Sequence, residues 1–346
     1  MARPTSPVDA PYDAVLVVSF GGPEGPEDVI PFLENVLRGK NVPRERLLEV
    51  AQHYQQFGGV SPINAQNRQL VAAVSAQLLA AGRQLPVYLG NRNWQPLLPD
   101  TIRQMADDGG RRALAFVTSA YSSYSGCRQY LEDVERARQI VGAAAPQVEK
   151  LRAFFNHPGF IEPQAEALTA ALEKLPVDRR AGARVIFTAH SIPVAMARNC
   201  DYEAQLLEAC RLVAGAAMHP KWRLVYQSRS GPPSQPWLEP DVCDYLREVA
   251  GSNDAQDVVV VPIGFLTDHV EVLHDLDTEA RAVCEEFGLN MIRVSAVGAH
   301  PRFVRMVVEL IEERIADAPR LALGTMGPRA DVCPPDCCPS GRPSRA

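Results

Sequence analysis

Positive charge and long apolar runs are both scarce in this sequence of 346 residues. It holds 35 lysine and arginine residues against 41 aspartate and glutamate residues, so it offers no basic field for nucleic acid. The first apolar run, Ala14 to Phe20, is far too short to span a bilayer, which predicts no transmembrane segment. Residues 1–12 also lack a basic start followed by an apolar core, so we expect a cytoplasmic location.

The common nucleotide-binding motifs are missing as well. Neither G-x-G-x-x-G nor G-x-x-x-x-G-K-S/T occurs, which argues against a nicotinamide oxidoreductase, the rival that shares the expected fold. Gly21 and Gly22 do follow the first apolar run and would let a ligand approach the backbone. Acidic residues follow them, however, where a phosphate needs a neutral or positive field.

Cysteine is unevenly distributed. Five of the eight cysteines are dispersed, and three crowd into Cys333-Pro-Pro-Asp-Cys337-Cys338. A cytoplasmic location makes structural disulfides unfavourable, so the three crowded cysteines are candidate ligands.

Short β-rich runs alternate with longer segments of helical period, which predicts an α/β fold with parallel sheets flanked by helices. The expected strands are 14–20, 86–90, 113–118, 184–188, 223–227, 258–265 and 291–294. The expected helices are 68–81, 129–141, 163–175, 203–217 and 301–316. We expect an N-terminal extension at 1–11, two similar lobes at 12–160 and 161–317, and a Cys/Pro-rich tail at 318–346.

An acidic run begins at Asp268, directly after an expected strand, where ligands bind in open α/β sheets. On a helix, Asp268, Glu271, Asp275 and Glu279 would line one face. Like charges at this spacing destabilise a helix by roughly a few tenths of a kcal/mol per pair. The face therefore needs either a cation or a function that moves protons or metal, and an ordinary solvated face is the alternative.

His190 lies just past another expected strand, where Pro193 prevents the sheet from continuing. If the two strand ends converge, His190 meets His269 and Glu271 in a small volume. Imidazole plus carboxylate suits Fe(II), Co(II) or Zn(II), and imidazole also takes up protons near neutral pH. A purely structural histidine is the alternative.

Other strand ends carry candidate pocket walls. Cations at Arg38, Lys40, Arg44 and Arg46 precede a glycine turn at 57–63 and suit the carboxylates of a ligand, or form a solvated face. Tyr130 ends a tyrosine-containing segment, and Trp237 lies in a proline-stiffened loop that fits a pocket wall. Both aromatic residues would equally suit a core.

Five ordered motifs together resemble the ferrochelatases, which insert Fe(II) into a porphyrin. They are Phe20-Gly21-Gly22-Pro23, Gly58-Gly59-Val60-Ser61-Pro62, Ala189-His190-Ser191-Ile192-Pro193, Tyr226-Gln227-Ser228-Arg229 and Pro262-Ile263-Gly264-Phe265 with Asp268-His269-Val270-Glu271. The resemblance covers nearly all of residues 12–316. It is nearest to the actinobacterial branch, which is similar to the coproporphyrin III ferrochelatases. It implies two Rossmann-like lobes of the class II chelatase fold, with the porphyrin in the cleft between them.

The resemblance implies a role for each matching position. His190 becomes the histidine of the metal centre and Glu271 its partner carboxylate, although which of them accepts protons stays open. Asp275, Asp277 and Glu279 continue as a proton or metal path, on a helix commonly widened into a π turn. The expected porphyrin contacts are Ser61, Arg38, Tyr130, Phe20 and Trp237. Phe20 replaces a tyrosine or methionine of some members and cannot ligate iron.

The activity that follows is insertion of Fe(II) into coproporphyrin III to give coprohaem in haem biosynthesis, with release of two protons and with transfer partners in the pathway. Rival functions are a protoporphyrin IX ferrochelatase, a cobalt or nickel chelatase for another tetrapyrrole, and a non-catalytic haem carrier. A carrier would not require the acidic path.

Some family members also hold a 2Fe-2S cluster on three C-terminal cysteines and one upstream cysteine. Here Cys333, Cys337 and Cys338 are candidates, although their spacing departs from the vertebrate pattern. Such a cluster usually takes four thiolates, and Cys127 and Cys200 are both candidates for the fourth. The alternative is a redox-sensitive tail, or a site that takes zinc.

Overall fold

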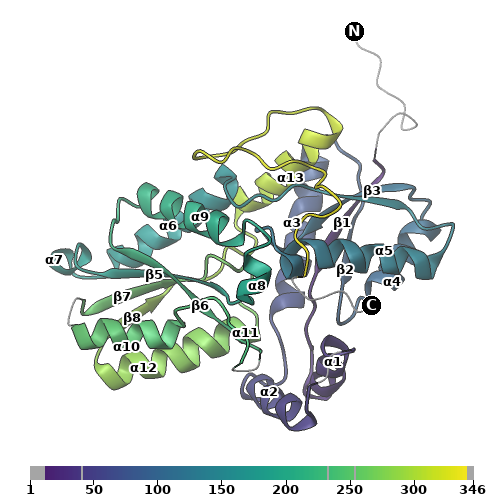
Figure 1. Ribbon diagram of the computed structural model, residues 1–346. Helices are drawn as coiled ribbons and strands as arrows, with labels where there is room; N and C mark the ends of the chain where they lie inside the picture. Colours follow the sequence, from purple (N-terminus) through teal and green to yellow (C-terminus); the bar gives the residue numbers. More distant parts are fainter. Residues whose placement is uncertain (1–11, 40–41, 232–233, 253–254, 341–346) are drawn as a thin grey trace.

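The computed structural model describes residues 12–39, 42–231, 234–252 and 255–340, so the expected extension at 1–11 and Lys40 lie outside it. Two four-stranded parallel sheets form its framework (Figure 1). The first has the order β2-β1-β3-β4, from β1 (Ala14–Ser19), β2 (Val87–Asn91), β3 (Arg112–Val117) and β4 (Gln147–Lys150). The second has the order β6-β5-β7-β8, from β5 (Arg184–His190), β6 (Trp222–Gln227), β7 (Asp257–Val261) and β8 (Asn290–Arg293). Both sheets thus share one topology, which confirms the expected two-lobe α/β fold.

In the first lobe, apolar residues alternate between the two faces of β1. Val15 and Val17 pack toward α3 (Ile63–Ala80) and α13 (Pro301–Ile315). Leu16 and Val18 pack on the opposite face, toward two other helices of the lobe. Those helices are α4 (Leu98–Asp107) and α5 (Gln129–Val141). Burial on both faces explains why β1 is continuously apolar in the sequence.

The second lobe is layered in the same way. Phe187 of β5 faces a core with α6 (Pro158–Glu173) and α9 (Tyr202–Ala216). Its neighbour Ile186 faces the opposite core. The helices on that second side are α10 (Val242–Ser252) and α12 (Arg281–Phe287).

Two structures join the lobes. Helix α13, although late in the chain, packs against α3 of the first lobe and α6 of the second. Helices α1 (Val29–Val36) and α2 (Arg44–Gln56), which we call the α1–α2 arm, form a small core that includes Val270 of the second lobe. The division at residue 160 stays a prediction; α6 begins two residues before it, at Pro158.

Two of the differences between the expected and the observed elements have a plain physical cause. Strand β7 ends at Val261 rather than at residue 265, because Pro262 has no N–H to donate to a neighbouring strand. Strand β4 was not expected, since it is a short, polar and half-exposed edge strand. The remaining short elements are η2 (Pro26–Asp28), η3 (Tyr124–Arg128), α7 (Val177–Arg180), α8 (Val194–Ala197), α11 (Val270–Val272) and η4 (Leu273–Ala280). No described helix is long and apolar enough to cross a membrane.

Buried polar side chains tie the C-terminal tail to the body of the protein. The Asn156 amide donates to the carbonyl oxygens of Leu323, at 3.2 Å, and Gly327, at 2.9 Å. The Arg152 guanidinium donates to the Leu321 carbonyl at 2.9 Å. Residues 321–327 of the expected tail are therefore held by the body of the protein, while residues 341–346 lie outside the described part of the chain.

Candidate active site

The sheet topology brings His190 and Glu271 to one place. In the second sheet the chain runs from β5 to β6 on one side and then to β7 on the other, so the order reverses between β5 and β7. Ligands of open α/β sheets bind at such a switch point, beyond the carboxyl ends of the strands. His190 is the last residue of β5, and Glu271 lies in α11 after β7. Gly264 allows this close approach, because a Cβ there would lie 2.7 Å from the Ala189 Cα atom.

The His190 ring is oriented so that its Nε2 atom is available to a substrate. Its Nδ1 atom lies 2.6 Å from the carbonyl oxygen of Ser191. Because a carbonyl only accepts hydrogen bonds, Nδ1 carries the proton of the neutral ring and Nε2 carries the lone pair. Nε2 faces Glu271 Oε2 at 3.9 Å, and the two side chains are 37% and 45% exposed. Both groups therefore stay accessible to a substrate.

The loop after His190 is fixed by the Trp237 loop. The Ser191 hydroxyl donates to the Leu238 carbonyl at 2.8 Å, and the Leu238 amide donates to the Ile192 carbonyl at 3.0 Å. Trp237 itself is half-buried and packs so tightly on Gly231 that a Cβ there would lie 2.4 Å from the indole. Trp237 thus adjoins His190 through this loop.

The acidic series is shorter than the sequence predicts. Asp268 precedes the helix and pairs with Arg293, with Nη1 2.8 Å from its Oδ1. The same guanidinium holds Asp277, with Nε 2.7 Å from Oδ1. Placing Asp268 on the helical face is therefore wrong: helical period does not reveal that the helix starts at Val270 or that a distant cation takes the charge.

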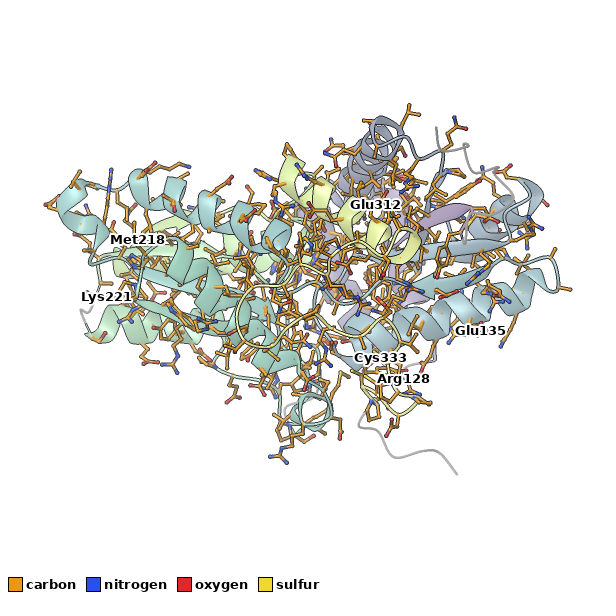
Figure 2. All side chains as sticks on the ribbon, turned by 90° about the horizontal axis from the view of Figure 1, so that it is seen from above. Arg128, Glu135, Met218, Lys221, Glu312 and Cys333 are labelled. Atoms are coloured by element: carbon orange, nitrogen blue, oxygen red, sulfur yellow. The ribbon has the colours of Figure 1, made fainter. Side chains whose placement is uncertain are left out.

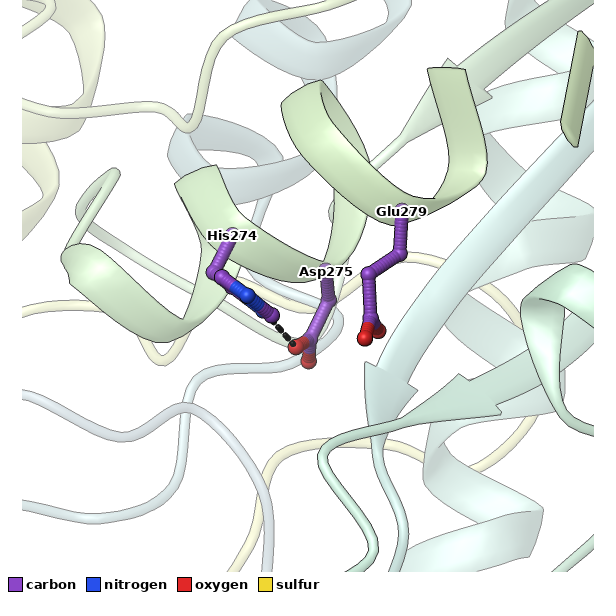
Figure 3. A group of neighbouring side chains, drawn as sticks. All are labelled: His274, Asp275 and Glu279. Carbon is purple, nitrogen blue, oxygen red and sulfur yellow. Dashed lines mark ion pairs between the residues drawn. The ribbon is translucent and has the colours of Figure 1, made fainter. Parts of the chain in front are cut away.

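Glu271 lies in α11, and Asp275, Asp277 and Glu279 lie on a π-helix, η4, as the family resemblance implies. Its i→i+5 hydrogen bonds put more than four residues in each turn, so positions spaced by four stay on one side. Asp275 and Glu279 accordingly project together with His274, and the ligand atoms of these three residues all lie within 4.8 Å of one another (Figure 3).

Neighbouring charges and burial shift the pKa values of His274, Glu279 and His269. The Asp275 carboxylate, 3.6 Å from Nδ1 of His274, raises the pKa of that imidazole. Burial, and then the Asp275 charge, raise the pKa of Glu279. Burial lowers the pKa of His269, whose ring packs edge-on against Phe265 at 5.3 Å. At these histidines and carboxylates, a proton and a metal cation would compete for the same nitrogen and oxygen atoms.

In the first lobe, Phe20 packs against the core of the α1–α2 arm, which includes Val270 beside Glu271. Phe20 follows β1, and its ring packs edge-on against Phe32 with centroids 6.2 Å apart. Ser61 is buried and its amide donates to the Pro23 carbonyl at 2.8 Å. Gly22 makes room for it, since a Cβ there would lie 2.7 Å from the Ser61 Cβ atom.

Two other expected porphyrin contacts lie in different surroundings. Tyr130 is only 6% exposed and is covered by the Arg92 guanidinium, 4.4 Å from its ring centroid. Arg92 in turn pairs with Asp133 at 2.5 Å. Arg38 is exposed just past the end of α1.

Sequence reasoning missed several residues that approach this site from elsewhere in the chain. His53 of α2 stacks on His274, and the neighbouring Tyr54 is buried close enough to Glu271 for that charge to raise its pKa further. The Gln227 amide donates to Asp275 Oδ2 at 3.1 Å, and the Ser228 hydroxyl donates to the same oxygen. Gln227 and Ser228 belong to a recognised motif, whereas nothing in the local sequence marks His53.

Four cysteines gather around one cavity between α5 and the C-terminal tail. Cys127 of η3 adjoins Cys333, whose thiol raises the pKa of Cys127, and Sγ of Cys337 lies 3.2 Å from Sγ of Cys338. All four line one cavity of about 590 Å³. Arg128 holds the segment in place by donating to the Cys337 carbonyl at 2.9 Å (Figure 2).

Among the cysteines of this cavity, Cys333 has the surroundings that favour its thiolate form. The hydrogen bond from Cys127, assisted by the Lys150 charge, lowers the pKa of Cys333 to about 5. Cys200 lies near Cys337, but its own thiol is directed to the Met196 carbonyl of α8, at 3.4 Å. Of the two candidates for a fourth sulfur ligand, Cys127 is therefore the one in contact with the tail cysteines.

Known proteins match this chain over nearly its whole length. The ferrochelatase family model matches residues 12–315. A ferrochelatase of Rhodopirellula baltica is 59% identical over 95% of this chain and 93% of its own length. A coproporphyrin III ferrochelatase of Streptomyces griseus is 50% identical over 97% of this chain and 96% of its own.

A solved structure shows the same fold at much lower sequence similarity. SirB from Bacillus subtilis with Fe3+ has a TM-score of 0.53 at 12% identity, covering 88% of this chain and 96% of that one. Long matches at 50% and 59% identity, together with the family match, decide the family. As its ordered motifs predicted, the chain belongs to the ferrochelatase family.

Proposed function

We propose that this protein inserts Fe(II) into coproporphyrin III, giving coprohaem and two protons. The observation that carries this proposal is the open His190–Glu271 pair at the switch point of the second sheet, with Nε2 3.9 Å from Oε2. An exposed imidazole lone pair beside a carboxylate is able both to take a pyrrole proton and to hold a divalent metal.

In the proposed reaction the porphyrin lies between the Phe20 wall and the His190–Glu271 pair. Walls near Phe20 and Trp237 help to ruffle the ring, which tilts the pyrrole lone pairs toward the metal side. Two N–H bonds break and four Fe–N bonds form, so two protons leave as Fe(II) enters. His190 Nε2 accepts a proton, since its Nδ1 is committed to the Ser191 carbonyl. Glu271 holds the metal, and Asp275 and Glu279 carry protons away or iron in.

Coproporphyrin III is proposed as substrate because the Streptomyces griseus relative, matched along 97% of this chain, acts on it by name. The substrate has four propionates, whereas protoporphyrin IX has two. We assign the propionate contacts to Ser61, Arg38 and the neighbourhood of Tyr130.

An anaerobic assay with Fe(II) tests the substrate assignment. Loss of free-porphyrin fluorescence should be at least about tenfold faster, as kcat/KM, with coproporphyrin III than with protoporphyrin IX, because one lost charge-assisted contact costs about 1.4 kcal/mol or more. Equal or faster turnover of protoporphyrin IX would overturn the assignment. Tight binding of both porphyrins without turnover would instead indicate a carrier.

We also propose that Cys127, Cys333, Cys337 and Cys338 hold a 2Fe-2S cluster. Such a cluster takes two thiolates at each iron, and here Cys337 and Cys338 form one contacting pair while Cys127 and Cys333 line the same cavity. Two thiolates on one tetrahedral metal lie about 3.8 Å apart, close to the 3.2 Å between Cys337 and Cys338. The depressed pKa of Cys333 favours the ligating form. The bound cluster would supply one-electron redox chemistry.

Two serine variants distinguish the candidates for the fourth ligand. Cys127→Ser should lower the iron and acid-labile sulfide content per chain by about tenfold and remove the visible absorption, because one of four thiolates is lost. Cys200→Ser should retain both, since the Cys200 thiol is directed to the Met196 carbonyl. The reverse result would make Cys200 the ligand, and purified protein without iron and sulfide would contradict a cluster.

We place this reaction in the cytoplasm, with partners that deliver the porphyrin and accept the product. All eight cysteines are free, which suits a reducing compartment.

A further inference from the structure

Two buried tyrosines contact the segments that carry the His190–Glu271 pair. Tyr202 of α9 is 6% exposed, and its hydroxyl donates to the backbone carbonyl of His190 at 3.0 Å. Tyr121 follows β3 of the first lobe and is 3% exposed. Its hydroxyl donates to the backbone carbonyl of Ile263, just past the end of β7, at 3.0 Å. Each tyrosine thus holds one of the two chain segments from which the pair projects.

The Tyr202 hydrogen bond fixes the peptide group that orients the His190 ring. The N–H of the same peptide group, which belongs to Ser191, donates to the Gln227 carbonyl at 2.8 Å. Both polar atoms of this peptide group are therefore held. Its position in turn places the Ser191 carbonyl oxygen 2.6 Å from Nδ1 of His190. Because that contact decides which ring nitrogen carries the proton, Tyr202 acts on the Nε2 lone pair through the backbone.

The Tyr121 hydrogen bond fixes the turn that leads from β7 toward Glu271. Ile263 is the residue of this turn that accepts the bond. The next residue, Gly264, donates its amide to the Thr188 carbonyl of β5 at 3.0 Å. The turn is therefore held both by β5, which ends at the catalytic histidine, and by a side chain from the first lobe.

The two tyrosines also contact each other across the lobes. Their ring centroids lie 6.1 Å apart with planes at 85°, an edge-to-face arrangement. Beside them the Ser122 amide donates to Gln205 Oε1 at 2.8 Å, and Gln205 Nε2 donates back to Ser122 Oγ at 2.9 Å. Tyr202 and Gln205 are three positions apart on α9 and so share one face of it. This buried contact leaves both hydroxyls little freedom to move.

We propose that Tyr202 and Tyr121 are positioning residues for iron insertion, which set the separation and orientation of His190 and Glu271 through the backbone. This role rests on the proposed function. Both hydroxyls are committed to backbone carbonyls, so neither tyrosine takes part in the chemistry itself. Their effect on turnover is large because a displacement of about 1 Å at a reacting group costs up to about 10²-fold in rate.

Phenylalanine variants remove each hydroxyl and keep each ring. Tyr202→Phe and Tyr121→Phe should each lower the kcat for iron insertion by about tenfold, while the Kd for coproporphyrin III changes by less than about threefold. Tyr12→Phe is the matched control, since Tyr12 is also buried and its hydroxyl donates to Glu149 at 2.9 Å. It should retain kcat within about twofold, although urea denaturation should show a comparable loss of stability.

Nitrogen NMR of protein labelled at its histidine rings provides a second readout, without porphyrin or metal. The His190 signals are identified by their loss in His190→Ala. In the wild-type protein the neutral His190 ring should carry its proton on Nδ1. Tyr202→Phe should raise the population of the form protonated on Nε2 by at least about threefold. Tyr121→Phe should leave this population unchanged, because Tyr121 acts on the turn at Ile263.

A kcat within about twofold of wild type in either tyrosine variant would overturn the proposal. An equal loss of kcat in Tyr12→Phe would also overturn it, because stability alone would then account for the loss. Unchanged protonation of the His190 ring in Tyr202→Phe would contradict the role of Tyr202. A wild-type protein that metallates no porphyrin, but whose His190 ring responds to Tyr202→Phe as expected, would refute the proposed function and leave the positioning of His190 by Tyr202 supported.

Discussion

Replacing His190 with alanine is expected to lower the kcat for iron insertion by about 10³-fold, while the Kd for porphyrin changes by less than about threefold. The reason is geometric: His190 Nε2 is the exposed lone pair at the site, 3.9 Å from Glu271, and Nδ1 is already bound to the Ser191 carbonyl. Loss of a positioned base typically costs 10²–10⁴-fold, and loss of a metal contact adds to it. Steady-state kinetics and porphyrin fluorescence quenching measure the two quantities separately.

The matched control for this variant is His300→Ala, which removes a comparably exposed imidazole that pairs with Glu166 rather than with Glu271. It should retain kcat within about twofold. An equal loss of porphyrin affinity and turnover in His190→Ala would show that His190 mainly binds porphyrin. Retained turnover would remove His190 from the reaction altogether.

The largest expected effect on stability comes from the Arg152–Glu313 ion pair. The guanidinium donates to both carboxylate oxygens, at 2.7 Å and 2.8 Å, and both side chains are only 1% exposed. Glu313→Gln leaves the arginine charge buried without its counter-ion, so the free energy of unfolding should fall by about 3–5 kcal/mol. Arg152 also donates to the Leu321 carbonyl, so the start of the tail should loosen with it.

Chemical denaturation with urea measures this change, and Glu49→Gln serves as the control. Glu49 pairs with Arg46 on the surface, where the two side chains are 59% and 53% exposed, so its removal should cost less than about 1 kcal/mol. A loss below 1 kcal/mol for Glu313→Gln as well would mean that water or a neighbouring group compensates the buried arginine.

Local sequence patterns predicted the framework because the central strands are buried on both faces. The continuous apolar runs of β1, β5 and β7 mark strands covered by helices, and α5 was predicted with its observed bounds, 129–141. The polar edge strand β4 has no such pattern and was missed. The sequence therefore predicts a strand most clearly where the strand is fully buried, and least clearly where it is polar and lies at a sheet edge.

Parts of the candidate site that depend on distant partners were not predictable in this way. The sequence places Asp268 and Glu271 in one acidic series, and only the fold shows that Arg293 neutralises Asp268. The contact between His53 and His274 likewise arises from the packing of the α1–α2 arm against the second lobe. Motifs identify residues at strand ends, whereas pairing across lobes is a property of the assembled structure.

The most direct test of the central claim is the mass of the porphyrin recovered after anaerobic multiple turnover with Fe(II) and coproporphyrin III. The expected product has gained one iron and lost two hydrogens, in molar excess over the protein, and His190→Ala yields none above the uncatalysed background. Recovery of only unmetallated coproporphyrin III from the wild-type protein would contradict the proposal that this chain is a coproporphyrin ferrochelatase.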